Sequence, residues 1–319
     1  MLAAFATSFS PDSPLDGLQV GDAPEPVERE NWTTVDVRAA SLNHHDVWSL
    51  RGVGLREQQL PMILGTDAAG VAPDGSEVIL HGVVGADGHG VGPREPRTLL
   101  SEHYPGTLAE RVAVPTANLI PKPSGLSFEE AACLPVSWLT AYTMLFTVGG
   151  LAPGDSVLVQ GAGGGVSTAA VLLGVAAGLE VFVTSRSEEK RKRALGLGAA
   201  AALAPGERLP RRVDVVLESV GRATWQHSVR SVRPGGTIAV CGATSGDASP
   251  AELTRIFFQE IRVQGVTMGS RDDLAALANF VARQDVKPLI DSVHPLARTR
   301  EAMSAMVDGA QFGKIVVTP

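Results

Sequence analysis

The pattern of apolar and polar positions changes character near residue 120. Before that point, short strand-like runs such as 34–39, 75–80 and 107–114 are separated by turns rich in Gly, Pro and Asp. Runs of this kind, bounded by turn residues, are typical of a small and irregular β-rich domain.

From residue 126 onward, short apolar runs alternate with helical stretches. The predicted strands are 156–160, 180–184, 213–217, 237–241 and 261–266, and the predicted helices include 166–177, which Gly178 ends, and the charged 188–195. Short continuous apolar runs indicate buried strands. Strands that alternate with helices predict right-handed βαβ units and therefore a doubly wound parallel sheet, which is an α/β fold.

The last segment contains one helical stretch, 298–307, and a final strand-like run, 314–318. We expect this tail to rejoin the first domain. The chain then divides into residues 1–118 with 289–319 in one domain and residues 119–288 in the other. A cleft between two such domains is a usual place for a small-molecule site.

Composition narrows the class of protein. Hydrophobic residues make up 44% and charged residues 19% of the chain, which is ordinary for a globular protein. No run reaches the roughly 18 apolar residues of a membrane span, and the N-terminus lacks a basic leader, so we expect a cytoplasmic protein without membrane contact. The net charge of −7 disfavours a nucleic-acid partner. The two cysteines, Cys133 and Cys241, are expected to be buried and unreactive.

A glycine-rich turn stands between the first predicted strand and helix of the sheet. Its glycines are Gly161, Gly163, Gly164 and Gly165, and Val166 begins the helix. Glycine permits positive φ and close approach of a ligand, and a helix N-terminus attracts a pyrophosphate. The strict dinucleotide fingerprint has a third glycine where Val166 stands, so an ordinary turn is the alternative. The strand before and the helix after it favour dinucleotide binding.

The end of the next strand indicates which dinucleotide is bound. NAD enzymes usually carry an acidic residue about 20 residues after the turn, but Ser185 and Arg186 stand there, followed by Lys190. The basic side chains suit a 2′-phosphate, and the serine can hydrogen-bond it. We therefore favour NADP(H). The alternative is that these charges form a solvated helix face.

At this point the chain resembles the medium-chain dehydrogenase/reductase superfamily, closest to its zinc-lacking quinone oxidoreductase-like members. The resemblance covers nearly the whole length. Besides the glycine turn, its motifs are residues 40–46 (ASLNHHD), 64–70 (LGTDAAG), 106–110 (GTLAE), 131–135 (AACLP), 140–142 (TAY) and 233–236 (RPGG). It implies a GroES-like catalytic domain built from both chain ends, with a Rossmann domain inserted between them.

The resemblance also bears on metal binding. The positions that match the catalytic zinc ligands of relatives hold Asn43, Thr66 and Val136, none of which is a good zinc ligand. The four-cysteine lobe of structural zinc is missing as well, because residues 82–104 contain no cysteine. We expect no metal site.

Without zinc, the enzyme lacks the Lewis acid that eases alcohol oxidation, so reduction is expected. A hydride would pass from NADPH to a quinone or an α,β-unsaturated carbonyl, and at most one proton donor is required. The resemblance gives Asn43, His45 and Thr66 as catalytic candidates. Asn43 would donate to a carbonyl oxygen and His45 lies near the proton relay of relatives. A structural role for His45 is the alternative, and Asp46 is expected to brace the nearby backbone.

Further cofactor residues are implied by their match to relatives. The segments that line the nicotinamide are Thr140, the loop with Gly242, Ala243 and Thr244, and the loop with Met268 and Gly269. These loops follow the fifth and sixth strands, where open α/β sheets bind ligands. Lys314 is expected to reach the pyrophosphate.

Two other functions remain open. One is an alcohol or aldehyde oxidoreductase that works without zinc, and the other is a non-catalytic NADP(H)-binding redox sensor. Because 261–266 is predicted to be the last strand of its sheet, its free edge favours a homodimer or a tetramer.

Overall fold

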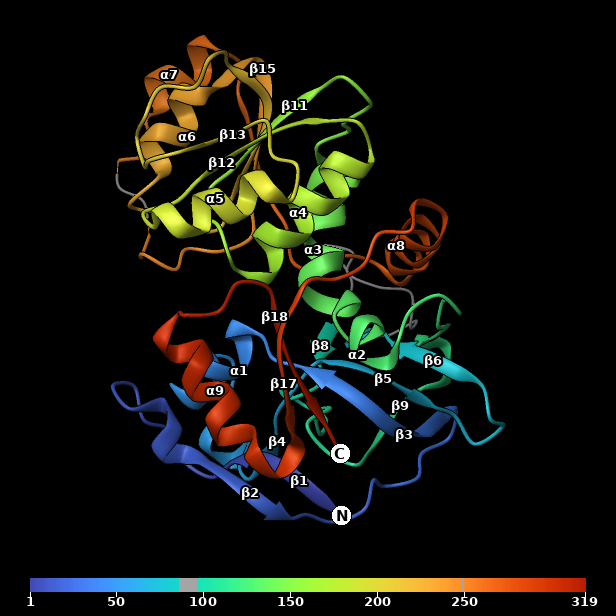
Figure 1. Ribbon diagram of the computed structural model, residues 1–319. Coiled ribbons are helices and arrows are strands. Elements are labelled where there is room, and N and C mark those ends of the chain that lie inside the picture. Colours follow the sequence, from blue (N-terminus) through green and yellow to red (C-terminus); the bar gives the residue numbers. More distant parts are fainter. Residues whose placement is uncertain (86–96, 248–249) are drawn as a thin grey trace. The chain divides into compact units, whose positions relative to one another are not determined.

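The protein folds into two compact units made of different parts of the chain. The computed structural model describes residues 1–85, 97–247 and 250–319. Unit 1 contains residues 1–137 and 270–319, and unit 2 contains residues 138–269. In Figure 1, whose colours follow the sequence, the blue and the red ends of the chain both belong to unit 1.

The unit boundaries differ from the predicted domain boundaries of 118/119 and 288/289. Strand β10 (Leu119–Pro121) stays in unit 1 because it pairs with β6 (Glu77–Leu80). Helix α8 (Arg271–Gln284) also stays there, and its first residue, Arg271, donates a hydrogen bond to the carbonyl of Ala117. Both elements are held in unit 1 by contacts with residues distant in the sequence, which the pattern of apolar and polar positions does not show.

Unit 2 is built on a six-stranded sheet in which every pairing is parallel. Its strands are β11 (Ser156–Val159), β12 (Glu180–Thr184), β13 (Ala201–Leu203), β14 (Val213–Glu218), β15 (Val232–Val240) and β16 (Arg262–Gly265), in the order β13-β12-β11-β14-β15-β16. This reversal of strand order beside β11 is that of the doubly wound dinucleotide-binding fold. It confirms the predicted Rossmann sheet.

The helices of unit 2 connect these strands. They are α4 (Gly165–Ala176), α5 (Glu188–Gly196), α6 (Trp225–Ser231) and α7 (Leu253–Phe258), while α3 (Leu139–Tyr142) precedes the sheet. The apolar strand residues form a core with residues of α6, including Leu158, Phe182, Val216 and Val229. Strands with continuous apolar sequence are therefore buried, as the pattern predicts.

Unit 1 is β-rich and includes the end of the chain. Its larger sheet has the order β10-β6-β5-β3-β18-β17, with β9 also paired to β3, and a smaller sheet has the order β2-β1-β4. The further strands are β1 (Leu2–Ala6), β2 (Leu18–Asp22), β3 (Trp32–Ser41), β4 (Met62–Ile63), β5 (Asp67–Val71), β9 (Arg111–Pro115), β17 (Ile290–Pro295) and β18 (Lys314–Thr318), besides the hairpin β7 (Val83–Gly85) and β8 (Arg97–Leu99).

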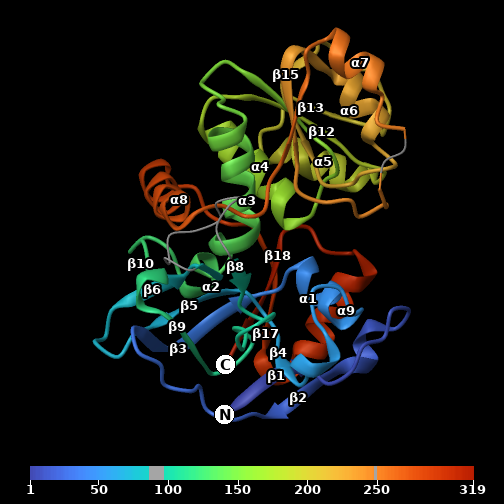
Figure 2. The ribbon, with the colours of Figure 1, turned by 180° about the vertical axis from the view of Figure 1, so that it is seen from behind.

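The tail of the chain lies inside this sheet. Strand β18 pairs with β3 in antiparallel and with β17 in parallel orientation. Helix α9 (Thr299–Asp308) packs on β18 and beside α1 (His44–Leu50), as both views show (Figures 1 and 2). The predicted return of the tail to the first domain is therefore observed.

One predicted strand is only partly correct. The run 107–114 forms a strand from Arg111 onward, whereas its first residues follow a different path. The N–H groups of Gly106 and Leu108 donate to the carbonyls of Ile63 and Leu64. This stretch is held by irregular pairing that the alternation of side chains does not reveal.

A helical run links the two parts of the sequence. Among the described residues, Phe128–Val148 is one run of 21 residues that is long and apolar enough to cross a membrane, in contrast to the expectation that no such run occurs. Since 72% of its apolar window is buried inside the protein, it has the burial of a core helix. It includes α2 (Phe128–Ala131), and its last part leads into unit 2.

Candidate cofactor and catalytic sites

The glycine turn follows β11 and opens α4. Gly161 and Gly163 have φ values of +84° and +97°, which other residues rarely adopt. Gly164 is the N-cap and provides no side-chain hydrogen bond, so the first N–H groups of the helix are left for a ligand. A Cβ atom at Gly164 would meet only Ser167 Oγ, at 3.7 Å, which leaves open space at the turn. These features fit a dinucleotide pyrophosphate.

A buried chain of hydrogen bonds supports this turn. The N–H of Gly161 donates to Thr184 Oγ1 at 3.2 Å, and the Thr184 hydroxyl donates to Gln160 Oε1 at 2.6 Å. The Gln160 amide nitrogen then donates to Ser228 Oγ and to His227 Nδ1, both at 2.9 Å. The chain joins the ends of β11 and β12 to α6 and so fixes the start of the turn.

The chain ends at a buried carboxylate. Ser228 Oγ donates to Glu218 Oε2 at 2.5 Å, and Glu218 is fully buried. Its other donors include the N–H groups of Val220 and Gly221 and the hydroxyl of Thr224. Because all these groups donate to the carboxylate, its negative charge is compensated without a cation.

Sequence reasoning missed the members of this chain. Gln160, Thr184 and Glu218 each end an apolar strand run, and a polar residue at that place was the available signal. Carboxyl ends of neighbouring parallel strands meet at one edge of the sheet. Polar strand ends at that edge are therefore candidates for a shared network.

The end of β12 carries the residues predicted to select NADP(H). Ser185 is buried, and its Oγ accepts a hydrogen bond from the N–H of Ser187 at 3.2 Å. Arg191 donates from its guanidinium to the carbonyls of Ser185 at 2.6 Å and Arg186 at 3.4 Å. Arg191 thus shapes the turn that holds the two residues.

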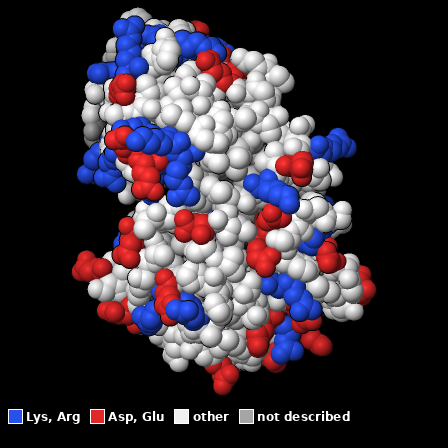
Figure 3. Space-filling model, in the orientation of Figure 1, with Lys and Arg blue, Asp and Glu red and all other residues white. Residues whose placement is uncertain are grey.

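Arg186 itself is exposed, and its side chain makes no hydrogen bond or ion pair with the residues that the structure describes. Lys190 lies in the first turn of α5 and is half-buried. Figure 3 shows the charged side chains of α5 gathered on one part of the surface. The guanidinium of Arg186 is available to an anion beside the strand end.

The segments implied for the nicotinamide follow other strands of the same sheet. Gly242, Ala243 and Thr244 follow β15, and Met268 and Gly269 follow β16. They lie at the sheet edge that also carries Gly161, because all these strands are parallel. Thr140 lies on α3 and is 6% exposed.

In unit 1, Asn43 belongs to a buried polar group. It is the N-cap of α1, and its Oδ1 accepts a hydrogen bond from Lys314 Nζ at 2.7 Å. Its Nδ2 donates to Asp67 Oδ2 at 2.9 Å and to the carbonyl of Ser41 at 3.4 Å. Both ends of the amide are engaged, which counts against the predicted hydrogen bond from Asn43 to a substrate carbonyl.

Lys314 is the cation of this group, with 2% of its side chain exposed. Besides Asn43, its ammonium donates to Asp67 Oδ2 at 3.0 Å and to the carbonyl of Leu42 at 2.8 Å. The three hydrogens of the ammonium are therefore used within unit 1. This placement corrects the expectation that Lys314 reaches the pyrophosphate.

The same geometry decides how well zinc would fit. The amide oxygen of Asn43 already accepts a hydrogen bond from the ammonium of Lys314. The Thr66 hydroxyl lies 3.3 Å from both the Leu100 carbonyl and Ser101 Oγ. Val136 has no ligand atom in its side chain. Among residues 1–85, 97–247 and 250–319, no three His, Cys, Asp or Glu side chains form a metal-binding group. The donors present do not fit a catalytic zinc.

His45 has a partner that the sequence did not indicate. Its Nε2 lies 3.0 Å from Glu102 Oε1, and both side chains are about one quarter exposed. Burial lowers the pKa of His45, but the hydrogen bond to Glu102 and the charges of Asp46 and Glu102 outweigh it and raise the pKa above 6.5. The pair can hold a proton near neutral pH. Glu102 lies 57 positions away in a turn, so no local pattern pointed to it.

Asp46 and Thr66 have structural partners. The carboxylate of Asp46 accepts hydrogen bonds from the N–H groups of Asn43 at 2.8 Å and Gly65 at 3.0 Å, so it braces the backbone as predicted. Thr66 is 2% exposed. Its buried hydroxyl is less suited to contact a substrate than the partly exposed His45.

The two cysteines lie near the buried charged groups, Cys133 near Lys314 and Asp67 and Cys241 near Glu218. Cys133 is fully buried, while Cys241 is only partly buried, in contrast to the prediction. Burial raises the pKa of each thiol to about 12, and Glu218 adds to the effect at Cys241. Both thiols are therefore protonated and weakly nucleophilic at neutral pH.

Comparisons with known proteins agree with this architecture. The Alcohol dehydrogenase GroES-like domain matches residues 29–124, and the Zinc-binding dehydrogenase domain matches residues 165–283. A zinc-type alcohol dehydrogenase-like protein of Schizosaccharomyces pombe is 28% identical, with 89% of each chain covered.

Two solved structures are similar to this protein over most or all of both chains. An NAD-dependent alcohol dehydrogenase has 32% identity and a TM-score of 0.89, with both chains fully covered. A 2-octenoyl-CoA carboxylase reductase, solved with NADP and 2-octenoyl-CoA, has 25% identity and a TM-score of 0.89, with 99% of this chain and 87% of that chain covered. The chain belongs to the medium-chain dehydrogenase/reductase superfamily, a family of oxidoreductases.

Proposed function

We propose that the protein is a zinc-independent, NADPH-dependent oxidoreductase that reduces a quinone or an α,β-unsaturated carbonyl compound. The observation that carries the proposal is the buried ammonium of Lys314, held 2.7 Å from Asn43 Oδ1 where relatives bind zinc. The ammonium of Lys314 already occupies the polar group of Asn43 and Asp67. The other two positions that match zinc ligands, Thr66 and Val136, offer no thiolate, imidazole or carboxylate. Reduction of an activated double bond does not require zinc to stabilise an alkoxide.

The residues of unit 2 would hold the dinucleotide. The turn Gly161–Gly165 and the N-terminus of α4 would receive the pyrophosphate, and Thr140 and the loops after β15 and β16 would contact the nicotinamide. When bound, the reduced nicotinamide supplies a hydride. The chain from Thr184 to Glu218 fixes the turn before the ligand arrives, so less ordering accompanies binding.

The choice of NADPH over NADH rests on the end of β12. Ser185 and Arg186 occupy the place of the acidic residue that binds a ribose 2′-hydroxyl in NAD enzymes. The exposed guanidinium of Arg186 has no acidic partner among the described residues, so a 2′-phosphate can pair with it. The similar solved structures include both an NAD-dependent and an NADP-bound protein, and the proposed choice of NADPH rests on Ser185 and Arg186 of this chain.

His45 would supply the proton that reduction requires. Its raised pKa keeps a fraction of the imidazole protonated near neutral pH, and Glu102 stabilises that charge. Asn43, Thr66 and Asp46 are engaged with protein partners and would position α1 and the segment after β4.

The test is to measure binding of NADPH and NADH by tryptophan fluorescence, followed by oxidation of NADPH at 340 nm with quinones, enones and simple ketones. We expect tighter NADPH binding and turnover with quinones or enones but not with simple ketones. Absence of binding by either nucleotide, or turnover of alcohols with one zinc per chain, would refute the proposal.

A zinc-free alcohol or aldehyde oxidoreductase remains the second candidate, because alcohol dehydrogenases are among the similar structures. The partly exposed His45–Glu102 pair disfavours a redox sensor without turnover, since such a sensor needs no proton donor.

We also propose a cytoplasmic homodimer, formed through the free edge of β16.

A further inference from the structure

A cavity of about 370 Å³ opens in unit 1. Its walls come from β1, β2, β4, β9, the start of β3 and the loops 23–29 and 104–105. None of the residues assigned above to the cofactor or to proton transfer lines it. Its volume lies within the range of about 300–1,000 Å³ that is usual for small-molecule sites.

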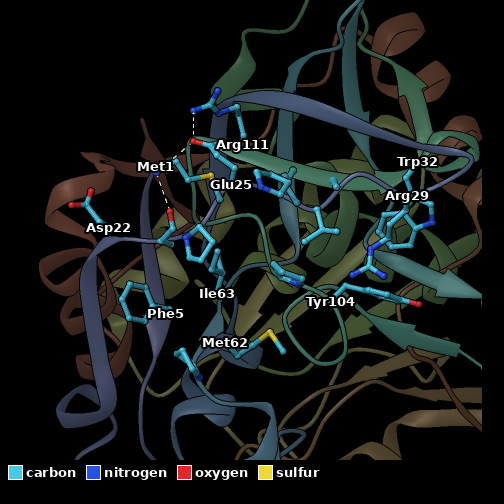
Figure 4. Close-up of a pocket in the computed structure, with 18 residues that line it drawn as sticks. Met1, Phe5, Asp22, Glu25, Arg29, Trp32, Met62, Ile63, Tyr104 and Arg111 are labelled. Atoms are coloured by element: carbon cyan, nitrogen blue, oxygen red, sulfur yellow. Dashed lines mark hydrogen bonds and ion pairs between the residues drawn. The ribbon is translucent and has the colours of Figure 1, made fainter.

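Most of the lining is apolar or aromatic (Figure 4). The side chains of Phe5, Met62 and Ile63 come from neighbouring strands, and Trp32 and Tyr104 form an aromatic wall. The rings of Trp32 and Tyr104 are 4.7 Å apart and tilted by 59°. Such a surface suits the body of a flat, apolar molecule.

The aromatic wall is held by two local turns. Asn31 has a φ of +61° in the turn where the Trp32 N–H donates to the Arg29 carbonyl. Ser101 has a φ of +70° in the turn where its N–H donates to the Tyr104 carbonyl. Local hydrogen bonds therefore set the backbone that carries both rings.

The charges around the cavity are not equivalent. Arg111 pairs with Glu25, with a distance of 2.7 Å between Nη2 and Oε1, and the same Oε1 lies 3.6 Å from the N-terminal ammonium of Met1. The Arg29 guanidinium lies over the rings of Trp32 and Tyr104, 5.3 and 5.1 Å from their centroids. It makes no ion pair with any residue in the described part of the chain. A guanidinium that stacks on rings keeps its N–H edge for an anion.

Asp22 sets the direction of a ligand. Figure 4 shows Asp22 and Phe5 on the opposite side of the cavity from Arg29 and Tyr104. A carboxylate is repelled at the Asp22 side and attracted at the Arg29 side. Arg29 is therefore the lining cation that has no ion pair within the described part of the chain, and it stands on the side of the cavity away from Asp22.

We propose that this cavity binds a small apolar carboxylate, such as an aromatic acid. The carboxylate pairs with the guanidinium of Arg29, and the apolar body lies against Trp32 and Tyr104 and extends towards Met62 and Ile63. No residue assigned to the dinucleotide lines this cavity, and the proposal does not depend on the proposed reaction.

The experiment uses the whole protein and two probes of the same shape. Naphthalene-2-carboxylate and the neutral naphthalene-2-carboxamide are titrated by calorimetry, with and without saturating NADPH. We expect the carboxylate to bind at least tenfold more tightly than the amide, with an affinity that NADPH leaves unchanged. Equal affinity of the two probes, no binding, or displacement of the carboxylate by NADPH overturns the proposal.

Two variants locate the bound probe. Arg29→Met keeps an apolar stem over the rings but removes the charge, and it should abolish the preference for the carboxylate. Arg38→Met removes an exposed arginine of β3 that does not line the cavity and should leave the preference intact. Equal effects of the two substitutions, or no effect of Arg29→Met, contradict the assignment. If Arg29→Met does not fold, the comparison of the two probes on the unchanged protein decides.

Discussion

Lys314 and Asn43 lie 271 positions apart in the chain and are joined by a hydrogen bond of 2.7 Å between Nζ and Oδ1. The same ammonium pairs with Asp67, which has no exposed side-chain surface. Removal of the cationic partner of a buried carboxylate strongly destabilises the folded protein. The stability of unit 1 therefore depends on this contact between distant segments.

Replacing Lys314 by Met should lower the free energy of unfolding by about 3–5 kcal/mol, because Asp67 stays buried without its cation. Denaturant unfolding measures the change. The double variant Lys314→Met, Asp67→Asn should regain part of the loss, and Lys192→Met, which removes an exposed lysine, should be neutral. Unchanged stability of Lys314→Met would show that the ion pair contributes little.

Replacing Glu102 by Gln should change the pH profile of reduction. The protonated imidazole is the donor, so kcat stays high below the raised pKa of His45 and falls as the pH rises through it. Loss of the Glu102 charge lowers that pKa, and the falling limb moves to lower pH by about one unit or more. Glu57→Gln, at an exposed position, is the control. If the falling limb of the pH profile does not move in Glu102→Gln, His45 is excluded as the proton donor.

Replacing Arg186 by Ala should weaken NADPH binding by about 10- to 100-fold, the contribution of charge-assisted hydrogen bonds. NADH has no 2′-phosphate, so its affinity should change little. Fluorescence titration with both nucleotides gives the two dissociation constants. Lys192→Ala on α5, the helix that follows Arg186, is the control, since Lys192 pairs with Glu188. Equal losses for NADPH and NADH would mean that Arg186 is only surface charge.

Replacing Thr184 by Val preserves shape but removes the hydroxyl that links Gly161 to Gln160. We expect the dissociation constants of both nucleotides to rise about two- to tenfold, because the turn is less well fixed. Thr33→Val, which removes an exposed hydroxyl bonded to Thr116 at 2.8 Å, is the control. If the affinities do not change while the fold is intact, the buried chain is not needed to position the turn.

Replacing Phe258 by Glu should separate the proposed dimer. Phe257, Phe258 and Leu253 are between 62% and 72% exposed on α7, and the neighbouring β16 ends its sheet. An apolar surface beside a free strand edge suits pairing with a second copy. Analytical ultracentrifugation should show a dimer that Phe258→Glu converts to monomer and that Val307→Glu on α9 does not. A monomeric wild-type protein contradicts the proposal.

Local features were predictable from the sequence because they depend on neighbouring residues. The glycine turn, the strand before it and the lack of an acid at Ser185 all lie within one continuous segment. Lys314 shows the limit of such reasoning. Its strand was predicted with correct bounds, yet its partners Asn43 and Asp67 come from elements far away in the sequence. The pairing of strands, which side-chain pattern alone does not determine, selects those partners.

Glu102 and Gln160 illustrate two further limits. Glu102 lies in an irregular turn, where no periodicity assigns a direction to a side chain. Gln160 ends a predicted strand, but its amide is used only because Thr184 and Ser228 come from neighbouring elements. The partners of both residues can be recognised only from the three-dimensional structure, which brings distant segments together.

The interior position of β18 also constrains the order in which the chain folds during synthesis. Unit 2 is continuous in sequence, so its sheet can form as soon as residues 138–269 leave the ribosome. In the larger sheet of unit 1, β17 and β18 must join last, because β18 pairs with β3 and β17 pairs with β18. Until Lys314 has been made, the carboxylate of Asp67 has no cation beside it. Unit 1 therefore still lacks β17 and β18 when the whole of unit 2 has been synthesised.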